Sequence, residues 1–210
     1  MALMRFYYLV FMMFAYSQIQ AGTIDTHGQA PYEQCGYCHE YDGNSIMPDY
    51  PRLAGQTKQY LIKQLYDFKT GKRKGLMQAT AELLTKQDIE TVATYFSQQS
   101  IRGVRANNQL ADHALAKKLY YQGDVKRNLI ACNLCHGQIS TDETPIPKLS
   151  GQHSNYLMGQ LLLFKSGKRS NDHNSVMRDI AEKLTRSEMT DLAEFLAEEG
   201  PNQSVNLDKR

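Results

Sequence analysis

The sequence of 210 residues lacks any strong excess of charge of one sign, since 24 Lys and Arg residues accompany 22 Asp and Glu residues. Residues 22–104 contain nine basic and nine acidic side chains, and residues 105–210 contain fourteen and thirteen. Long low-complexity stretches are also absent, and 41% of the residues are hydrophobic. The chain therefore offers neither a basic stripe for nucleic acid nor an acidic tail, and its composition is that of a folded protein.

Long hydrophobic runs are missing too, apart from one at the N-terminus. Residues 1–5 carry a single positive charge, residues 6–16 are almost wholly apolar and aromatic, and residues 17–22 are small or polar. This order is typical of a secretory signal, and the run is shorter than the roughly 20 apolar residues that span a bilayer. We predict a signal peptide over 1–21, with cleavage at its end or after Ser17. The alternative is an uncleaved amphiphilic anchor.

The chain contains an internal duplication. The segment PRLAGQTKQYLIKQLYDFKTGKR (51–73) reappears as PKLSGQHSNYLMGQLLLFKSGKR (147–169), with 13 of 23 positions identical and no gap. Two copies of this length indicate a tandem pair of small domains rather than a solenoid. We expect domains over 22–103 and 108–210, joined by a linker near 100–108.

Both copies have helical periodicity. Apolar residues fall on one side of a helix at 60–68 and again at 156–164. The last helix of each copy opens with a capping-box pattern, Thr85 to Asp88 and Thr185 to Glu188. Copy two is expected to start with a helix near 109–121. No alternating strand is found, so the predicted fold is all-α, with two small helical bundles.

All four cysteines lie in two short motifs, CGYCH (35–39) and CNLCH (132–136). Two cysteines three residues apart and an adjacent histidine supply two thioether bonds and one iron ligand from about one helical turn. The motifs therefore predict covalent haem at Cys35 and Cys38 and at Cys132 and Cys135. The iron ligands would be the two motif histidines, His39 and His136.

Three other interpretations of the cysteines compete with haem attachment. A zinc site would have to join motifs in separate domains, and a thioredoxin-like redox motif would need an α/β pattern that is missing. Two local disulfides remain possible in an exported chain.

Methionine is the common sixth ligand of electron-carrying haems, and its thioether raises the potential. A true ligand should recur in both copies, and Met77 and Met177 do so. His173 rivals Met177 but has no counterpart in copy one. The methionines that do not recur are expected in loops or the core; they are Met47, Met158 and Met189.

Pro51 and Pro147 also recur, twelve and eleven residues after the motif histidines. Their carbonyl oxygens are candidates to accept a hydrogen bond from the second ring nitrogen of each histidine. The basic run Lys72 to Lys74, repeated as Lys168 and Arg169, is expected in a solvated loop. Such a loop could also dock an acidic partner.

Together, CxxCH, P-x-L-[AS]-G-Q, Y-L…Q-L…F-K-[ST]-G-K-R, a methionine and a final helix, all present twice, resemble the di-haem cytochrome c4 family. The resemblance covers about residues 32–197. It implies two class I cytochrome c domains with pseudo-twofold symmetry, a periplasmic location often at the membrane face, and electron donation to a terminal oxidase. By the motif match, Cys35, Cys38, His39 and Met77 serve one haem. Cys132, Cys135, His136 and Met177 serve the other.

One departure is that the loop before the methionine is four residues longer in copy two, so the two irons are candidates to differ in exposure or potential. The favoured function is a one-electron carrier rather than an enzyme. The alternatives are a di-haem peroxidase and the haem subunit of a flavin-dependent sulfide dehydrogenase.

Overall fold

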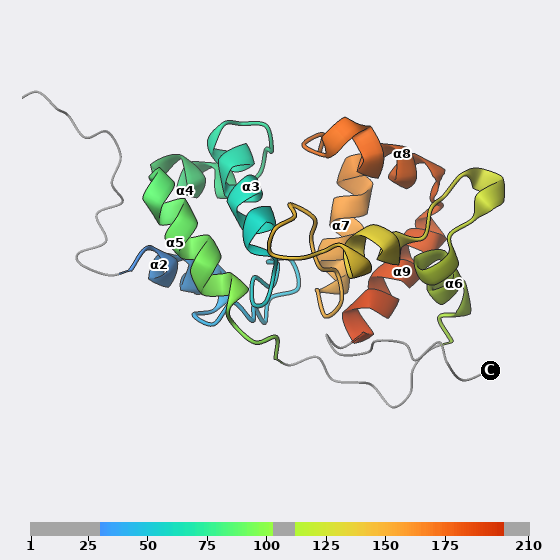
Figure 1. Cartoon of the computed structure of the whole chain (residues 1–210), viewed down its shortest axis with the longest axis horizontal. Coiled ribbons are helices and arrows are strands. Elements are labelled where there is room, and N and C mark those ends of the chain that lie inside the picture. Colours follow the sequence, from blue (N-terminus) through green and yellow to red (C-terminus); the bar gives the residue numbers. More distant parts are fainter. Residues whose placement is uncertain (1–29, 103–111, 200–210) are drawn as a thin grey trace, which may run out of the picture.

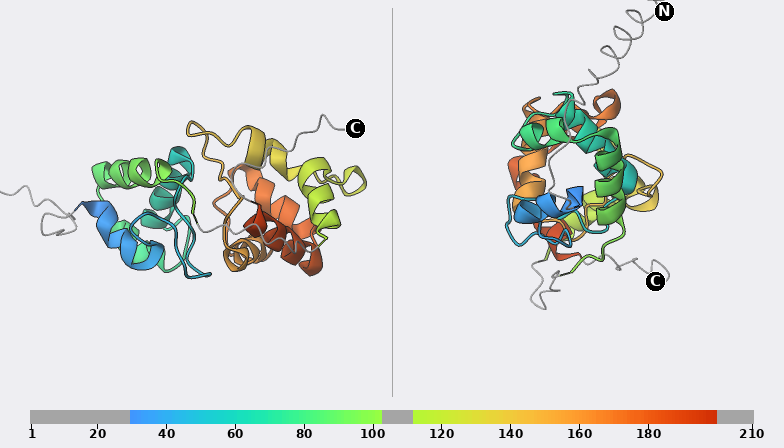
Figure 2. Two further views of the ribbon diagram at one scale, coloured as in Figure 1. Left: turned by 90° about the horizontal axis from the view of Figure 1, so that it is seen from below. Right: turned by 90° about the vertical axis from the view of Figure 1, so that its left-hand side faces the viewer.

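The computed structural model describes residues 30–102 and 112–199, which form two helical domains lying side by side (Figures 1 and 2). The described residues contain helices and a single isolated bridge, between Asp124 and Leu129, so the all-α prediction is confirmed. The predicted signal peptide lies outside the described residues. The predicted domain limits extend beyond them and stay a prediction.

Within residues 30–102, the first domain contains helices α2 (Pro31–His39), α3 (Lys58–Lys69), α4 (Met77–Leu83) and α5 (Lys86–Ser97). Helix α3 packs against α4 and α5, and α2 packs against α5. The core between them is apolar and consists of Leu61, Leu65, Leu84, Ile89, Val92, Ala93 and Phe96.

The second domain repeats this arrangement with more irregular connections. Its elements are α6 (Ala114–Gln122), η1 (Val125–Arg127), η2 (Leu134–Gln138), α7 (Ser154–Lys165), η3 (His173–Ser175), α8 (Val176–Lys183) and α9 (Arg186–Glu198). Helix α7 packs against α8 and α9, and α6 packs against α9. Helix α6 begins later than the expected 109, and residues 109–111 lie outside the described part.

Both predicted capping boxes are present. The Thr85 and Thr185 hydroxyls accept from the backbone N–H of Asp88 and Glu188, and these carboxylates accept in return from the threonine N–H. The caps fix the residues at which α5 and α9 begin, and both helices contribute side chains to the core of their domain.

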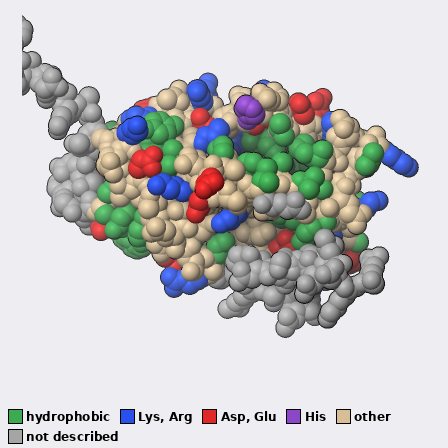
Figure 3. Space-filling view, viewed as in Figure 1, with side chains coloured by type: hydrophobic (Ala, Val, Ile, Leu, Met, Phe, Trp, Pro, Cys, Tyr) green, Lys and Arg blue, Asp and Glu red, His purple; other side chains and the backbone are tan. Residues whose placement is uncertain are grey.

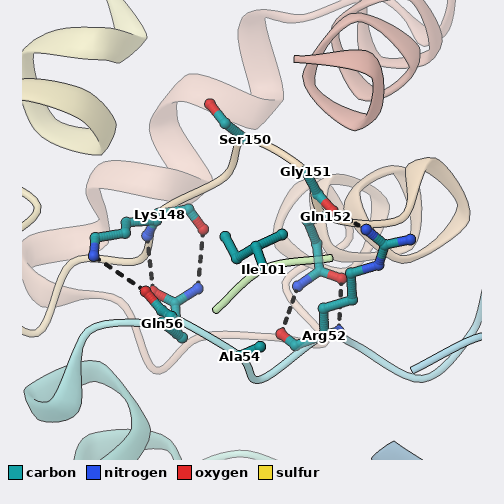
Figure 4. Close-up of a pocket in the computed structure, with 9 residues that line it drawn as sticks. Arg52, Ala54, Gln56, Ile101, Lys148, Ser150, Gly151 and Gln152 are labelled. Atoms are coloured by element: carbon teal, nitrogen blue, oxygen red, sulfur yellow. Dashed lines mark hydrogen bonds between the residues drawn. The ribbon is translucent and has the colours of Figure 1, made fainter. Parts of the chain in front are cut away.

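The two domains are joined by one glutamine from each domain, and each glutamine makes two hydrogen bonds to the backbone of the other domain (Figure 4). Gln56 donates to the carbonyl oxygen of Lys148 at 2.9 Å and accepts from its backbone N–H at 2.8 Å. Gln152 does the same with Arg52, at 2.9 and 2.8 Å. Gln56 and Gln152 are equivalent in the repeat, and so are Arg52 and Lys148. The interface is therefore pseudo-twofold symmetric.

A second cluster obeys the same symmetry. Arg73 and Arg169 each donate to one tyrosine of the other domain and to a glutamine from each domain, over 2.7 to 3.1 Å. The acceptors are Tyr60, Gln64, Tyr156 and Gln160. Each guanidinium also lies over a phenylalanine ring of its own domain, 4.6 Å from Phe68 and 4.4 Å from Phe164.

This placement corrects the expectation that the basic run is solvated. Arg73 is 8% exposed and Arg169 is 7% exposed, because both point into the interface. The expectation holds for the neighbouring lysines Lys72, Lys74 and Lys168, which are exposed.

Acidic and basic side chains are interspersed over the face shown in Figure 3, in line with the balanced composition. Within residues 30–102 and 112–199, no helix is both long and apolar enough to cross a membrane.

Candidate functional site

The first CxxCH motif forms the C-terminal half of α2. Pro31 begins this helix, a position where its missing N–H costs nothing. The motif therefore runs along one helix, as predicted, with Cys35 and His39 one turn apart. His39 is 3% exposed, and its Nδ1 donates to the carbonyl oxygen of Pro51 at 2.8 Å.

The second motif has a different backbone. Cys132 and Asn133 are helical, and the chain then continues as the π-helical turn η2. His136 nevertheless makes the same contact, with Nδ1 donating to the carbonyl oxygen of Pro147 at 2.9 Å. The predicted role of the two prolines as acceptors is confirmed in both domains.

These contacts decide which ring nitrogen can bind a metal. A carbonyl oxygen only accepts, so Nδ1 must carry the proton and Nε2 keeps its lone pair. Burial lowers the pKa of His39 and of His136, although the bonds to the prolines act in the opposite direction. Both imidazoles are therefore held neutral and oriented, as iron ligation requires.

All four cysteines are free thiols, so the structure contains no disulfide within either motif. Burial raises the pKa of Cys35 and of Cys132 to about 11. The structure also brings no three His, Cys, Asp or Glu side chains together as a metal cluster within its described residues. Free thiols beside an oriented histidine fit covalent haem attachment.

The two candidate methionines lie at equivalent places. Met77 is the first residue of α4 and Met177 is the second residue of α8, and each is half-buried against the core of its own domain. His173, the rival of Met177, is exposed in η3. Met189 is fully buried in the second core, as expected of a methionine that does not recur.

The comparisons with known proteins agree with this site. No family model matches the chain. It is 38% identical over 185 residues to cytochrome c4 of Stutzerimonas stutzeri, covering 80% of this chain and 86% of that protein. It is 31% identical over 174 residues to the thiosulfate dehydrogenase electron acceptor of the same species, covering 81% of each chain.

Among solved structures, the crystal structure of reduced recombinant cytochrome c4 from Pseudomonas stutzeri is similar with a TM-score of 0.74 at 36% identity. The match covers 82% of this chain and 100% of that one. The fold and the two attachment motifs define a di-haem c-type cytochrome, an electron-transfer protein with two covalently bound haem c groups. More narrowly, the chain belongs to the cytochrome c4 family, as the sequence motifs predicted.

The residues that join the domains were not predicted from the sequence. Gln56, Tyr60, Gln64, Arg73 and their equivalents bind the other domain and not the haem-attachment motif. Their recurrence in the repeat was the available signal. It was ambiguous, because a residue needed at either haem and a residue needed at a symmetric interface both recur in the same way.

Proposed function

We propose that this protein is exported to the periplasm and carries single electrons between redox proteins of the respiratory chain, with a terminal oxidase as final acceptor. The proposed iron ligands are His39 and Met77 for the first haem and His136 and Met177 for the second. Association with the membrane surface is part of the proposal, since the acceptor is a membrane enzyme.

The observation that carries the proposal is that each domain repeats a histidine bonded to a proline carbonyl and a methionine in the first turn of a later helix. In each domain Nδ1 of the histidine is committed to a proline carbonyl, which leaves Nε2 for iron. A methionine as second ligand favours the ferrous state and closes the iron to other ligands. Bound haem would supply the redox chemistry, and the chain would contribute the four ligand residues and their orientation.

The first test is an optical haem count on the purified holoprotein, followed by reduction and exposure to carbon monoxide. We expect two covalent haems and no response to the gas, because both irons are closed. A haem that binds the gas in the unmodified protein would contradict the ligand assignment and favour an enzyme with an open iron, such as a di-haem peroxidase.

The ligands are tested separately with Met77→Ala and Met177→Ala. Each variant should keep both haems attached and should bind carbon monoxide at one haem, since only one iron loses its sixth ligand. Met47→Ala is the matched control, because this methionine is 39% exposed and does not recur. An unchanged response in either ligand variant would refute that assignment.

A second candidate function is the electron acceptor of a sulfur-oxidising enzyme. It is supported by the relative whose name is thiosulfate dehydrogenase electron acceptor. The haem subunit of a flavin-dependent sulfide dehydrogenase belongs to the same class. Haem reduction by thiosulfate in the presence of a thiosulfate dehydrogenase would favour this function, and reduction only by a respiratory donor would favour the first.

A further inference from the structure

One departure of the interface from its twofold symmetry is the longer loop before Met177. This loop, residues 170–175, contains the four residues that copy two has in excess of copy one. Asn171 lies in this loop, and its side-chain nitrogen donates to Asp67 Oδ2 at 2.7 Å and to Gln64 Oε1 at 3.0 Å. Both acceptors belong to the first domain.

The same loop is bound from the first domain a second time. Lys63 donates to the backbone carbonyl of Asn171 at 2.6 Å and also forms an ion pair with Asp67, one turn along α3. Asp67 is 7% exposed, so its carboxylate is largely shielded from water, whereas the side chain of Lys63 is 31% exposed. Lys63 and Asp67 thus form a latch on the loop of the other domain.

The latch has no counterpart in the opposite direction. The positions equivalent to Lys63 and Asp67 in copy two are Gly159 and Leu163, neither of which has a polar side chain. The first domain therefore binds the loop before Met177 through Lys63 and Asp67. The second domain has no equivalent residues at these positions that could bind the loop before Met77.

From the latch, contacts continue to the methionine. Asp172, next to Asn171, accepts from the backbone N–H of Arg178 at 3.1 Å and from its Nε at 2.9 Å. Arg178 directly follows Met177 and also donates to the Ser175 hydroxyl at 2.9 Å. The loop is thus fixed to the first domain at one end and to the start of α8 at the other.

Between these anchors the backbone is strained. Asn174 and Ser175 both have positive φ, 49° and 62°, a conformation that is uncommon for non-glycine residues and that asparagine tolerates better than serine. Two such residues in succession persist only where the surroundings hold them in place. A loop under strain between two anchors is expected to relax when one anchor is lost.

We propose that Asp67 and Lys63 are positioning residues for the second haem, which hold the loop that presents Met177 from across the domain interface. The proposal rests on the assignment of Met177 as an iron ligand. It makes methionine ligation at the second haem depend on the contacts of Lys63 and Asp67 with residues 170–175, contacts that the first haem lacks.

The test is Asp67→Leu, which gives α3 the residue that copy two has at the equivalent position. The holoprotein is followed by a two-step redox titration and by NMR of the ferrous state, where each iron-bound methionine gives its own ring-current-shifted methyl signal. We expect the Met177 signal to weaken or disappear and the midpoint potential of the second haem to fall. The Met77 signal and the first potential should not change.

Two further variants keep the result specific. Asp67→Asn retains an oxygen that can accept from Asn171 and should restore most of the Met177 signal. Gln152→Leu breaks two bonds between the domains away from the loop and should leave both haems as in the wild type. An effect of Gln152→Leu equal to that of Asp67→Leu, or an equal change at both haems, would mean general loosening and would overturn the proposal.

An unchanged Met177 signal and second potential in Asp67→Leu would also overturn it. The ligand assignment is checked independently with Met177→Ala, which should remove one of the two methyl signals. If both signals survive in that variant, the assignment itself fails, and the latch proposal fails with it for that distinct reason.

Discussion

At the scale of single residues, Glu188 shows how one carboxylate serves two elements. It belongs to the capping box of α9 and also receives a two-pronged contact from Arg127, at 2.8 and 3.1 Å. The hydrogen bonds from Arg127 lower the pKa of Glu188 below its usual value, against the opposing effect of burial. Arg127 thereby ties the loop before the second CxxCH motif to the last helix.

This lowered pKa predicts a dependence of stability on acid pH. An unfolded glutamate has a pKa of about 4.3, so in that range the unfolded chain binds more protons than the folded one. The stabilisation is complete at neutral pH and is lost as the pH falls through the lower, folded-state value. Thermal unfolding of the holoprotein, followed by circular dichroism between neutral pH and pH of about 3, should show this loss.

The Glu188→Gln variant should be less stable at neutral pH. Its melting temperature should also fall less steeply as the pH is lowered, because its side chain does not ionise. Glu194→Gln, on an exposed position of the same helix, is the control and should follow the wild type. If Glu188→Gln lost stability with falling pH as steeply as the wild type, the acid sensitivity would come from other carboxylates.

At the scale of helices, the capping boxes predict similar effects in both domains. Loss of an N-cap hydroxyl typically costs about 1 kcal/mol. Thr85→Ala and Thr185→Ala should therefore each lower the free energy of unfolding by about that amount, measured by urea titration of the holoprotein. Thr190→Ala, exposed within α9, should be close to neutral. A neutral Thr185→Ala would mean that the Arg127 contact alone holds the start of α9.

The regular helices were predictable because their signals are local. The one-sided apolar pattern of α3 and α7 and the caps of α5 and α9 depend on residues within a few positions of one another. The π-turn at 134–138 and the left-handed pair Asn174 and Ser175 have no such signal. Neither member of that pair is glycine, the residue that would have marked a left-handed position in the sequence.

At the scale of the whole molecule, the buried arginines hold the two domains together. Arg73 and Arg169 share both acceptor glutamines, Gln64 and Gln160. Arg73→Leu would remove the donor to the Tyr156 hydroxyl while both glutamines keep Arg169, and a buried polar group left without a partner typically costs about 1–3 kcal/mol. The pseudo-twofold relation predicts that Arg169→Leu costs a similar amount.

The double variant should cost more than the sum of the two single variants, because only in the double variant does Gln160 lose both of its arginine donors. Urea unfolding of all four proteins gives the coupling free energy, with the exposed Lys72→Ala as a neutral control. Strict additivity would show that the two arginines act independently and that the shared glutamines contribute nothing to the interface.

The family and the haem motifs were accessible from sequence because covalent attachment demands fixed spacing. The domain arrangement was accessible only through the family resemblance. Periodicity describes which face of a helix is apolar, but it does not reveal that the polar residues Gln56 and Arg73 are buried against another domain. The burial of these residues depends on contacts between the two domains, which join residues far apart in the sequence. Because both copies contain the same residues, the repeat does not distinguish interface residues from haem-binding residues.

Covalent linkage of two like domains changes what one substitution can do. In a symmetric dimer of identical chains, a substitution at an interface appears on both sides at once. In this chain the same change appears once, so each half can diverge while the shared contacts still hold the pair together. The residues 170–175 and their partners Lys63 and Asp67 are such a divergence. Tandem duplication thus allows two like sites to acquire different surroundings, which identical subunits cannot do.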